Sequence, residues 1–279
     1  MKIYTPLKAL FSIGMAMSLT LSFSANAHRA WILPSSTSLS GEAPWVTFDA
    51  AVSNSLFVFE HVPLRMKGLM VQDPTGKLID VVNAHTGKYR STFDLNLVTE
   101  GTYKIGYASS GLRASWKDKE GKRKRWPARG KIANEADFSA EVPKNADSLK
   151  VSYGSRRLET FVTSGEPTEK VFEPTNSGLE LIPVTHPNDL FVGEAAKFQF
   201  LFHGKPAAGV KLALVKGNTR YRNDQNQIDV VTDEKGYASI TWPEAGMYLL
   251  EAEYEDDKAK APATIRTGSY GATLSVLPL

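Results

Sequence analysis

Five histidines, at positions 28, 61, 85, 186 and 203, are the residues of this sequence best suited to binding a transition metal, because the chain contains no cysteine. Without thiolates, a metal site has to use imidazole, carboxylate, thioether or the terminal amine, and thiol catalysis is excluded. His28 stands out among the five. At the N-terminus of a mature chain, its α-amine and its ring Nδ1 would chelate one metal ion together.

The first 27 residues predict that His28 becomes the N-terminus. Lys2 and Lys8 give a basic start, residues 9–23 form an apolar run, and Ala25 and Ala27 provide the small residues of a cleavage site. The run is shorter than the ~20 residues that span a bilayer. We therefore expect residues 1–27 to be a cleaved signal peptide, and the mature chain to be periplasmic without a transmembrane segment.

His61 is the best second histidine, because it lies between Phe57-Val-Phe-Glu60 and Pro63, at the expected end of a strand. An ordinary loop histidine is the alternative. His186 is a weaker candidate, since a turn or domain-interface residue is the favoured interpretation of its place before Pro187. His85 and His203 lie close to glycines in expected hairpin turns, and we expect both to face solvent.

Nearby carboxylates offer a further ligand for such a site. The candidates are Asp49, Glu60 and Asp189, and the sequence does not choose among them. Asp49 lies opposite the apolar face of its expected strand, so simple solvent exposure is the alternative. Imidazole combined with carboxylate suits nickel, copper, zinc or iron.

The elements expected around these residues are short strands. Residues 45–52 place apolar side chains at every second position, residues 67–82 have a hairpin turn at 73–76, and residues 89–97 and 102–108 alternate again. A turn-rich stretch, residues 164–178, separates this series from a second one that starts at Leu179. The sequence 244–248 also resembles 99–103. We predict an all-β fold of two tandem immunoglobulin-like antiparallel β-sandwiches, 28–163 and 179–279, joined by a linker at 164–178.

Charge is unevenly distributed along the chain. The formal charge of +3 falls to +1 when Lys2 and Lys8 are removed, which argues against a nucleic-acid binder. Residues 117–131 nevertheless contain eight Lys or Arg against Asp118 and Glu120. This basic loop is either a solvated loop or, helped by Trp116 and Trp126, a docking surface for an acidic partner or anionic lipid.

Several stretches together resemble one known family. They are His28-Arg-Ala-Trp-Ile-Leu-Pro-Ser35, Asn54-Ser-Leu-Phe-Val-Phe-Glu-His-Val-Pro63 and Leu179-Glu-Leu-Ile-Pro-Val-Thr-His-Pro-Asn-Asp189, followed by Asp233-Glu-Lys-Gly236 and Gly246-Met-Tyr248. The chain is similar to exported β-sandwich proteins of unassigned function formerly described as a nickel-uptake substrate-specific region. That resemblance implies a periplasmic protein associated with nickel or cobalt transport components.

Three functional hypotheses follow. The first is a non-enzymatic accessory protein that binds a divalent transition metal (nickel, cobalt or copper, with iron a further possibility for the uptake system) through His28, His61 and His186. It would pass the metal to a membrane or outer-membrane transporter. The second is a metal-free structural or interaction protein, for which tandem sandwiches suffice. The third is a copper oxygenase with a histidine brace formed by His28 and His61. Serine hydrolase chemistry has no support, because G-x-S-x-G is absent.

Overall fold

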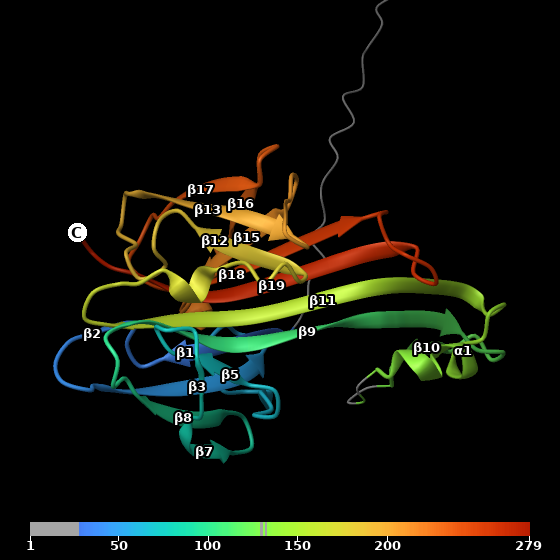
Figure 1. The fold of residues 1–279 in the computed structure, drawn as a ribbon, viewed down its shortest axis with the longest axis horizontal. Coiled ribbons are helices and arrows are strands. Elements are labelled where there is room, and N and C mark those ends of the chain that lie inside the picture. The colour runs from blue at the N-terminus through green and yellow to red at the C-terminus, as the bar shows by residue number, and fades with distance from the viewer. Residues whose placement is uncertain (1–27, 129–130, 132) are drawn as a thin grey trace, which may run out of the picture.

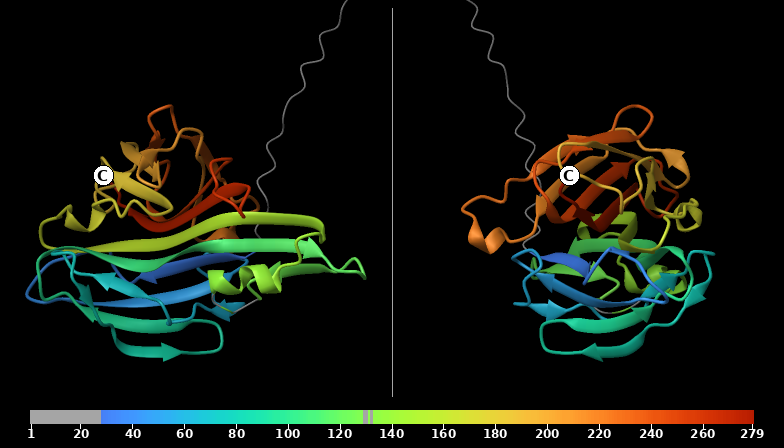
Figure 2. Two further views of the ribbon diagram at one scale, coloured as in Figure 1. Left: turned by 45° about the vertical axis from the view of Figure 1, so that its right-hand side comes forward. Right: turned by 90° about the vertical axis from the view of Figure 1, so that its left-hand side faces the viewer.

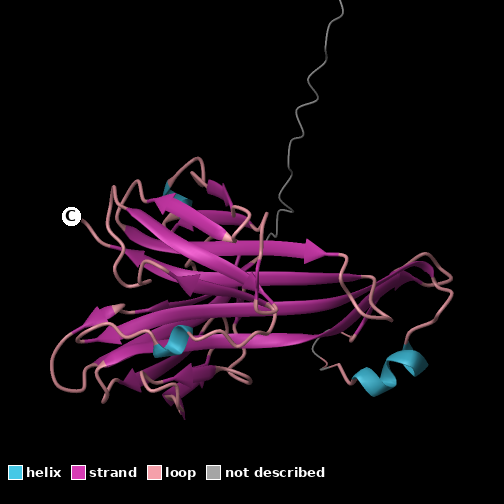
Figure 3. Ribbon diagram, turned by 45° about the horizontal axis from the view of Figure 1, so that its top comes forward, coloured by secondary structure: helices cyan, strands magenta, loops and turns pink. Residues whose placement is uncertain are grey.

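The computed structural model describes residues 28–128, 131 and 133–279, which form three β-sheets and a few single-turn helices (Figures 1 and 3). The expected signal peptide, residues 1–27, lies outside the described residues. In the described part of the chain, no helix is long and apolar enough to cross a membrane.

The first sheet has five strands and forms the outer layer of the N-terminal half. Its order is β1-β3-β8-β7, and β4 pairs with the end of β3. The strand expected at 45–52 is present as β3, and its side chains at positions 46, 48 and 50 are buried, as the alternation predicts. The bounds are β1 Arg29–Pro34, β3 Trp45–Ser53, β4 Val62–Pro63, β7 Val82–Thr86 and β8 Ser91–Asn96.

The second sheet has ten strands and runs through both halves of the molecule. Its order is β16-β15-β18-β19-β11-β9-β5-β6, with β10 on β9 and β2 on β11. Its bounds are β2 Ser38–Leu39, β5 Met70–Gln72, β6 Leu78–Ile79, β9 Gly101–Lys117, β10 Arg123–Trp126, β11 Asp147–Ser164, β15 Lys211–Lys216, β16 Ile228–Val231, β18 Gly246–Asp256 and β19 Ile265–Val276.

The third sheet covers the C-terminal half. It has the order β12-β13-β14, with β17 also paired to β13. The bounds are β12 Leu179–Pro183, β13 Ala195–Phe202, β14 Lys205–Pro206 and β17 Tyr237–Thr241. The short helices are η1 Glu135–Asp137, α1 Phe138–Glu141, η2 Lys170–Phe172 and η3 Thr219–Tyr221.

Each half is therefore a β-sandwich, which confirms the predicted fold class. The first sheet packs on β9 and β11 around a core that includes the stacked rings of Phe48 and Phe93, 4.8 Å apart. The third sheet packs on β15, β18 and β19 around Phe198, Phe200 and Trp242. Figure 2 shows the two sandwiches on opposite sides of the long central strands.

The sequence similarity between 99–103 and 244–248 corresponds to the same structural device in both halves. The hydroxyl of Tyr103 donates to the Thr99 carbonyl, and that of Tyr248 donates to the Glu244 carbonyl, each at 2.9 Å. A tyrosine that fastens the turn before its own strand is a known feature of immunoglobulin-like sandwiches. Each sandwich thus carries its own tyrosine corner.

The halves are joined by pairing that the sequence analysis does not predict. Strand β11 runs parallel to β19, from Ser152 opposite Ile265 to Thr160 opposite Thr273, and its end also runs parallel to β2. The other strand pairs within the described residues are antiparallel, as expected. Within 164–178, the expected linker, η2 buries Val171 and Phe172 in the C-terminal core.

The basic segment is a hairpin at the far end of the central strands rather than only a loop (Figure 1). β10 pairs with the end of β9, and Trp126 is buried, packing edge-on against Phe138 at 5.1 Å. The side chains at 117, 119 and 122–125 are exposed. Arg129, which the expected basic loop includes, lies outside the described residues.

Candidate functional site

His28 and His61 lie together at one end of β3. His28 directly precedes β1, whose first residue is opposite Ser53, and His61 directly precedes β4, whose Val62 is opposite Val52. The two imidazole rings are 4.2 Å apart between centroids and tilted by 38°. His28 is exposed and His61 is half-buried. Residues 33 positions apart in the sequence therefore place two imidazole rings side by side.

Hydrogen bonds hold the loop that carries His61. Buried Trp31 donates its indole N–H to Ser53 Oγ at 2.8 Å, and Ser53 Oγ donates to the Ser55 carbonyl at 2.7 Å. The Ser55 amide in turn donates to the Glu60 carboxylate, a bond that lowers the pKa of Glu60. Glu60 is therefore engaged by its own loop.

Aromatic packing fixes the same loop against the C-terminal half. The Phe57 and Phe59 rings lie 5.5 and 5.6 Å from the Trp31 ring. Gly217 makes room for this contact, because a Cβ there would come within 2.8 Å of the Phe57 ring. Buried Leu56, Val215 and Leu249 complete the cluster with Trp31. The histidine pair thus lies at the junction of the halves.

A cavity of about 250 Å³ opens beside His28 and extends over β11, β18 and β19. Glu251 lines it and accepts a hydrogen bond from Arg29 Nε at 2.9 Å. Burial raises the pKa of the Glu251 carboxyl, and the Arg29 charge opposes that shift. Glu251, which lines the same cavity as His28, is thus already paired with Arg29.

The third predicted ligand, His186, is elsewhere and its ring nitrogens are occupied. Nδ1 accepts from the Asn188 amide at 3.1 Å, and Nε2 is 2.9 Å from Thr102 Oγ1. The ring also packs edge-on against Phe172 at 5.4 Å. Burial lowers the pKa of His186, with Asp189 opposing. His186 therefore connects the first sandwich, η2 and the loop after β12 through these contacts.

His85 and His203 differ from each other more than expected. His85 is exposed, but it lies on β7 rather than in a turn. The expectation that His203 faces solvent is wrong: its ring is half-buried, and Nδ1 accepts from the Gly178 amide at 3.4 Å. Its contact with the Phe202 ring, at 4.5 Å, accounts for the difference, since both residues close the end of the second core.

The carboxylates proposed as extra ligands have other contacts in the structure. Asp49 pairs with Arg90 at 3.2 Å, Glu60 serves its own loop, and Asp189 lies in the turn after His186. Among the residues that the structure describes, no group of three or more His, Asp or Glu side chains is arranged to hold a metal. The α-amine of a mature chain would add a third donor beside His28 and His61.

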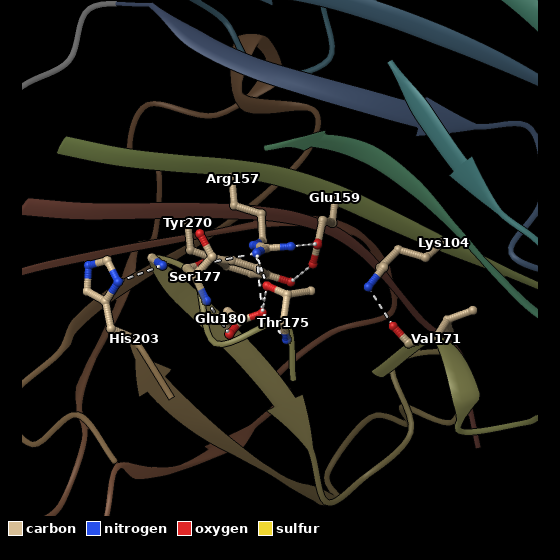
Figure 4. Close-up of polar contacts among 10 residues, drawn as sticks. Lys104, Arg157, Glu159, Val171, Thr175, Ser177, Glu180, His203 and Tyr270 are labelled. Carbon is tan, nitrogen blue, oxygen red and sulfur yellow. Dashed lines mark hydrogen bonds and ion pairs between the residues drawn. The ribbon is translucent and has the colours of Figure 1, made fainter. Parts of the chain in front are cut away.

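A buried ionic cluster, shown in Figure 4, is not anticipated from the sequence. Arg157 bonds to Glu159 at 3.1 Å and to Glu180 at 3.2 Å, and the Tyr270 hydroxyl donates to Glu159 at 2.8 Å. Lys104 nearby donates to the Val171 carbonyl. The cluster connects β9, β11, β12 and β19, and its saturated bonding indicates a structural role. Charged residues within strands otherwise buried on both faces are the signal that could have located it.

Comparison with known proteins gives a family. Residues 25–256, which include both histidines of the pair, match the model described as domain of unknown function DUF4198. The chain belongs to this family. No curated protein matches.

Three solved structures are distant likenesses of this chain. The D0-D1 domain of intimin is 10% identical, with 88% of this chain and 97% of that chain covered and a TM-score of 0.20. A marsupial T cell receptor is 12% identical, with 90% and 74% covered and a TM-score of 0.21. The Bacillus anthracis TIE protein is 15% identical, with 93% and 41% covered and a TM-score of 0.17. The three sheets of this chain define its fold.

Proposed function

We propose that this DUF4198 protein is a periplasmic accessory protein that binds a divalent transition metal for an uptake or handling system. The donors are the α-amine and ring of His28 and the ring of His61. The observation that carries the proposal is the 4.2 Å contact between the two imidazole rings beside an N-terminal cleavage signal. Nickel or cobalt is favoured by the family resemblance, and copper by the Irving–Williams order.

The environment of the pair suits reversible metal capture. His28 is exposed, so its nitrogens are accessible to a metal ion, and the loop bearing His61 packs on Trp31, which holds the second ring in place. Positioned donors lose less conformational freedom on binding. An exposed site is also suited to passing the ion to a membrane or outer-membrane transporter.

The amine chelate can be tested by adding one glycine before His28. The insertion moves the amine out of the chelate ring that it forms with the His28 imidazole but keeps both rings, so nickel affinity near pH 7 should fall by about tenfold or more. Copper is left out of this comparison, because a Gly-His terminus can chelate Cu(II) through the intervening amide nitrogen. His61→Ala should weaken binding less, because the two-donor chelate survives. His85→Ala is the matched control and should bind as the unaltered protein does. Isothermal titration, with the first residue established by mass spectrometry, measures all three. Unchanged affinity after the glycine insertion would remove the amine from the site.

The binding should also depend steeply on pH. Protons compete with metal for amine and imidazole nitrogens, whose ordinary pKa values are about 7.7–8.0 and about 6.5. Affinity is therefore expected to fall between about pH 8 and pH 5. Constant affinity over that range would point to carboxylate ligands instead.

A copper oxygenase is the second candidate, because the same three nitrogen donors make a histidine brace. The paired rings of His28 and His61 favour it, and oxygen consumption by the copper-loaded protein with ascorbate tests it. Turnover abolished by His61→Ala would support the enzyme. Absence of metal binding in every titration would instead leave the metal-free interaction protein.

A further inference from the structure

A larger cavity continues from the one beside His28. It has a volume of about 820 Å³ and lies on one face of the ten-stranded sheet, across β9, β11, β15, β18 and β19. The two cavities share Arg156, Glu253 and Ser269 as lining residues, so they adjoin on the sheet, and we call them together the groove; His28 lines its smaller part. Its volume is within the range of about 300–1,000 Å³ that small-molecule sites occupy.

Small residues make the floor of this groove. Gly154 on β11 lies opposite Thr267 on β19, and Ser155 lies opposite Gly268. A Cβ on Gly154 would lie 2.6 Å from Arg113 Nε, so the glycine lets the Arg113 side chain lie across the strand. The glycine at 154 thus lets a guanidinium lie along the floor.

Uncommitted charges line the groove. Arg113, Arg156 and Lys211 face it, as do Glu253 and Glu255. Within the described part of the chain, none of these five side chains belongs to an ion pair, although Arg29 and Glu251 next to them are paired. Guanidinium groups bind carboxylates through paired, charge-assisted hydrogen bonds. The groove therefore offers cations for carboxylates and two carboxylates for an amine.

The metal site needs ligands of this kind. Three nitrogen donors leave at least one position of a square-planar metal open and more in a tetragonal one, and Glu251, the carboxylate in the cavity beside His28, is already paired with Arg29. We propose that the metal binds as a complex with a small amino-carboxylate chelator. The groove holds the chelator, Arg156 and Arg113 contact its carboxylates, and His28 and His61 fill the open metal positions. This inference rests on the proposed metal-binding function.

Two matched tridentate probes test the inference. Nickel–iminodiacetate and nickel–diethylenetriamine share a central amine and differ in having terminal carboxylates or terminal amines. We expect the mature protein to bind the iminodiacetate complex at least tenfold more tightly in calorimetry. Native mass spectrometry should show protein, nickel and iminodiacetate together. Arg156→Gln and Arg113→Gln should each remove most of that preference, a loss of roughly tenfold for a charged hydrogen bond.

Controls separate the possible failures. Arg156→Lys should keep part of the preference, and Arg123→Gln, which is exposed on β10 and does not line the groove, should keep all of it. If nickel alone does not bind, the proposed function fails. If nickel alone binds but the chelator is stripped from every complex, the groove inference is overturned while the metal site stands. A preference for the triamine complex, or one untouched by Arg156→Gln and Arg113→Gln, would overturn it equally.

Discussion

The bonding of each ring nitrogen separates the histidines of this protein into ligand candidates and structural residues. His28 is exposed beside His61, and the hydrogen bonds of the described residues include neither ring. His186 has Nδ1 bonded to an amide, so its Nε2 carries the proton and donates to Thr102. A ring held in one neutral tautomer by two bonds has no lone pair to offer a metal. The sequence shows the residue types but not these bonds.

His186 should make the stability of the fold depend on pH. Burial lowers its pKa below the ordinary value of about 6.5 that the unfolded chain has. The unfolded state then binds more protons, so the stabilisation is complete above about pH 6.5 and is lost as pH falls through the folded value. His186→Gln should therefore flatten the fall in unfolding free energy between about pH 7.5 and pH 5.5. Urea titrations across that range measure it.

Two comparisons make that result specific. His85→Ala, an exposed residue on β7, should keep the pH slope of the unaltered protein. Metal affinity at pH 7.5 should be unchanged in His186→Gln, since the His186 ring is bonded to Thr102 and Asn188 and not to either histidine of the pair. An unchanged pH slope in His186→Gln would mean that other groups cause the acid sensitivity.

Strands are the elements that the sequence predicts best here. The apolar alternation at 45–52 and the turn residues at 73–76 predict structure from residues that are close in the sequence. The structure has strand β3 at the first position and the turn of the β5–β6 hairpin at the second. The parallel pairing of β11 with β19 joins residues more than a hundred positions apart, and no local pattern encodes it. For the same reason the Arg157–Glu180 pair and the groove escape sequence analysis.

The β9–β10 hairpin is the element on which the docking hypothesis can be tested. Replacing Lys122, Arg123, Lys124 and Arg125 by glutamine should weaken binding to vesicles rich in anionic phosphatidylglycerol and flatten its salt dependence, because exposed charges are screened within about 8 Å. Stability should hardly change, since all four side chains are exposed. Co-sedimentation at several salt concentrations measures the binding.

Trp126→Ala provides the contrast on the same hairpin. Its buried indole packs on Phe138 and donates to Glu141 at 2.7 Å, so its loss should cost about 3–5 kcal/mol. A quadruple variant that melted like Trp126→Ala would show that the charges serve the fold. Equal vesicle binding before and after neutralisation would contradict docking on lipid.

At the scale of the whole molecule, the two sandwiches are joined by a shared sheet and a shared apolar cluster in addition to residues 164–178. One sheet continues from β16 to β6 through both halves, and β11 contributes to both sandwich layers. The core around Trp31 includes Val215 and Leu249 of the other half. Separating the halves would expose strand edges and apolar side chains together. Tandem sandwiches joined only by a flexible linker would have neither feature.

The chain should therefore unfold in one cooperative transition, and Arg157 offers the sharpest test. Arg157→Met leaves Glu159 and Glu180 buried without their cation, which should cost on the order of 3–5 kcal/mol and lower the melting temperature by roughly 10 °C. Because the cluster connects β11, β12 and β19, calorimetry should show the entire peak moving. Lys170→Ala, which breaks an exposed pair with Glu173, should change stability by no more than about 0.5 kcal/mol. Two separate peaks, with only one shifted, would show instead that the halves fold independently despite their shared sheet.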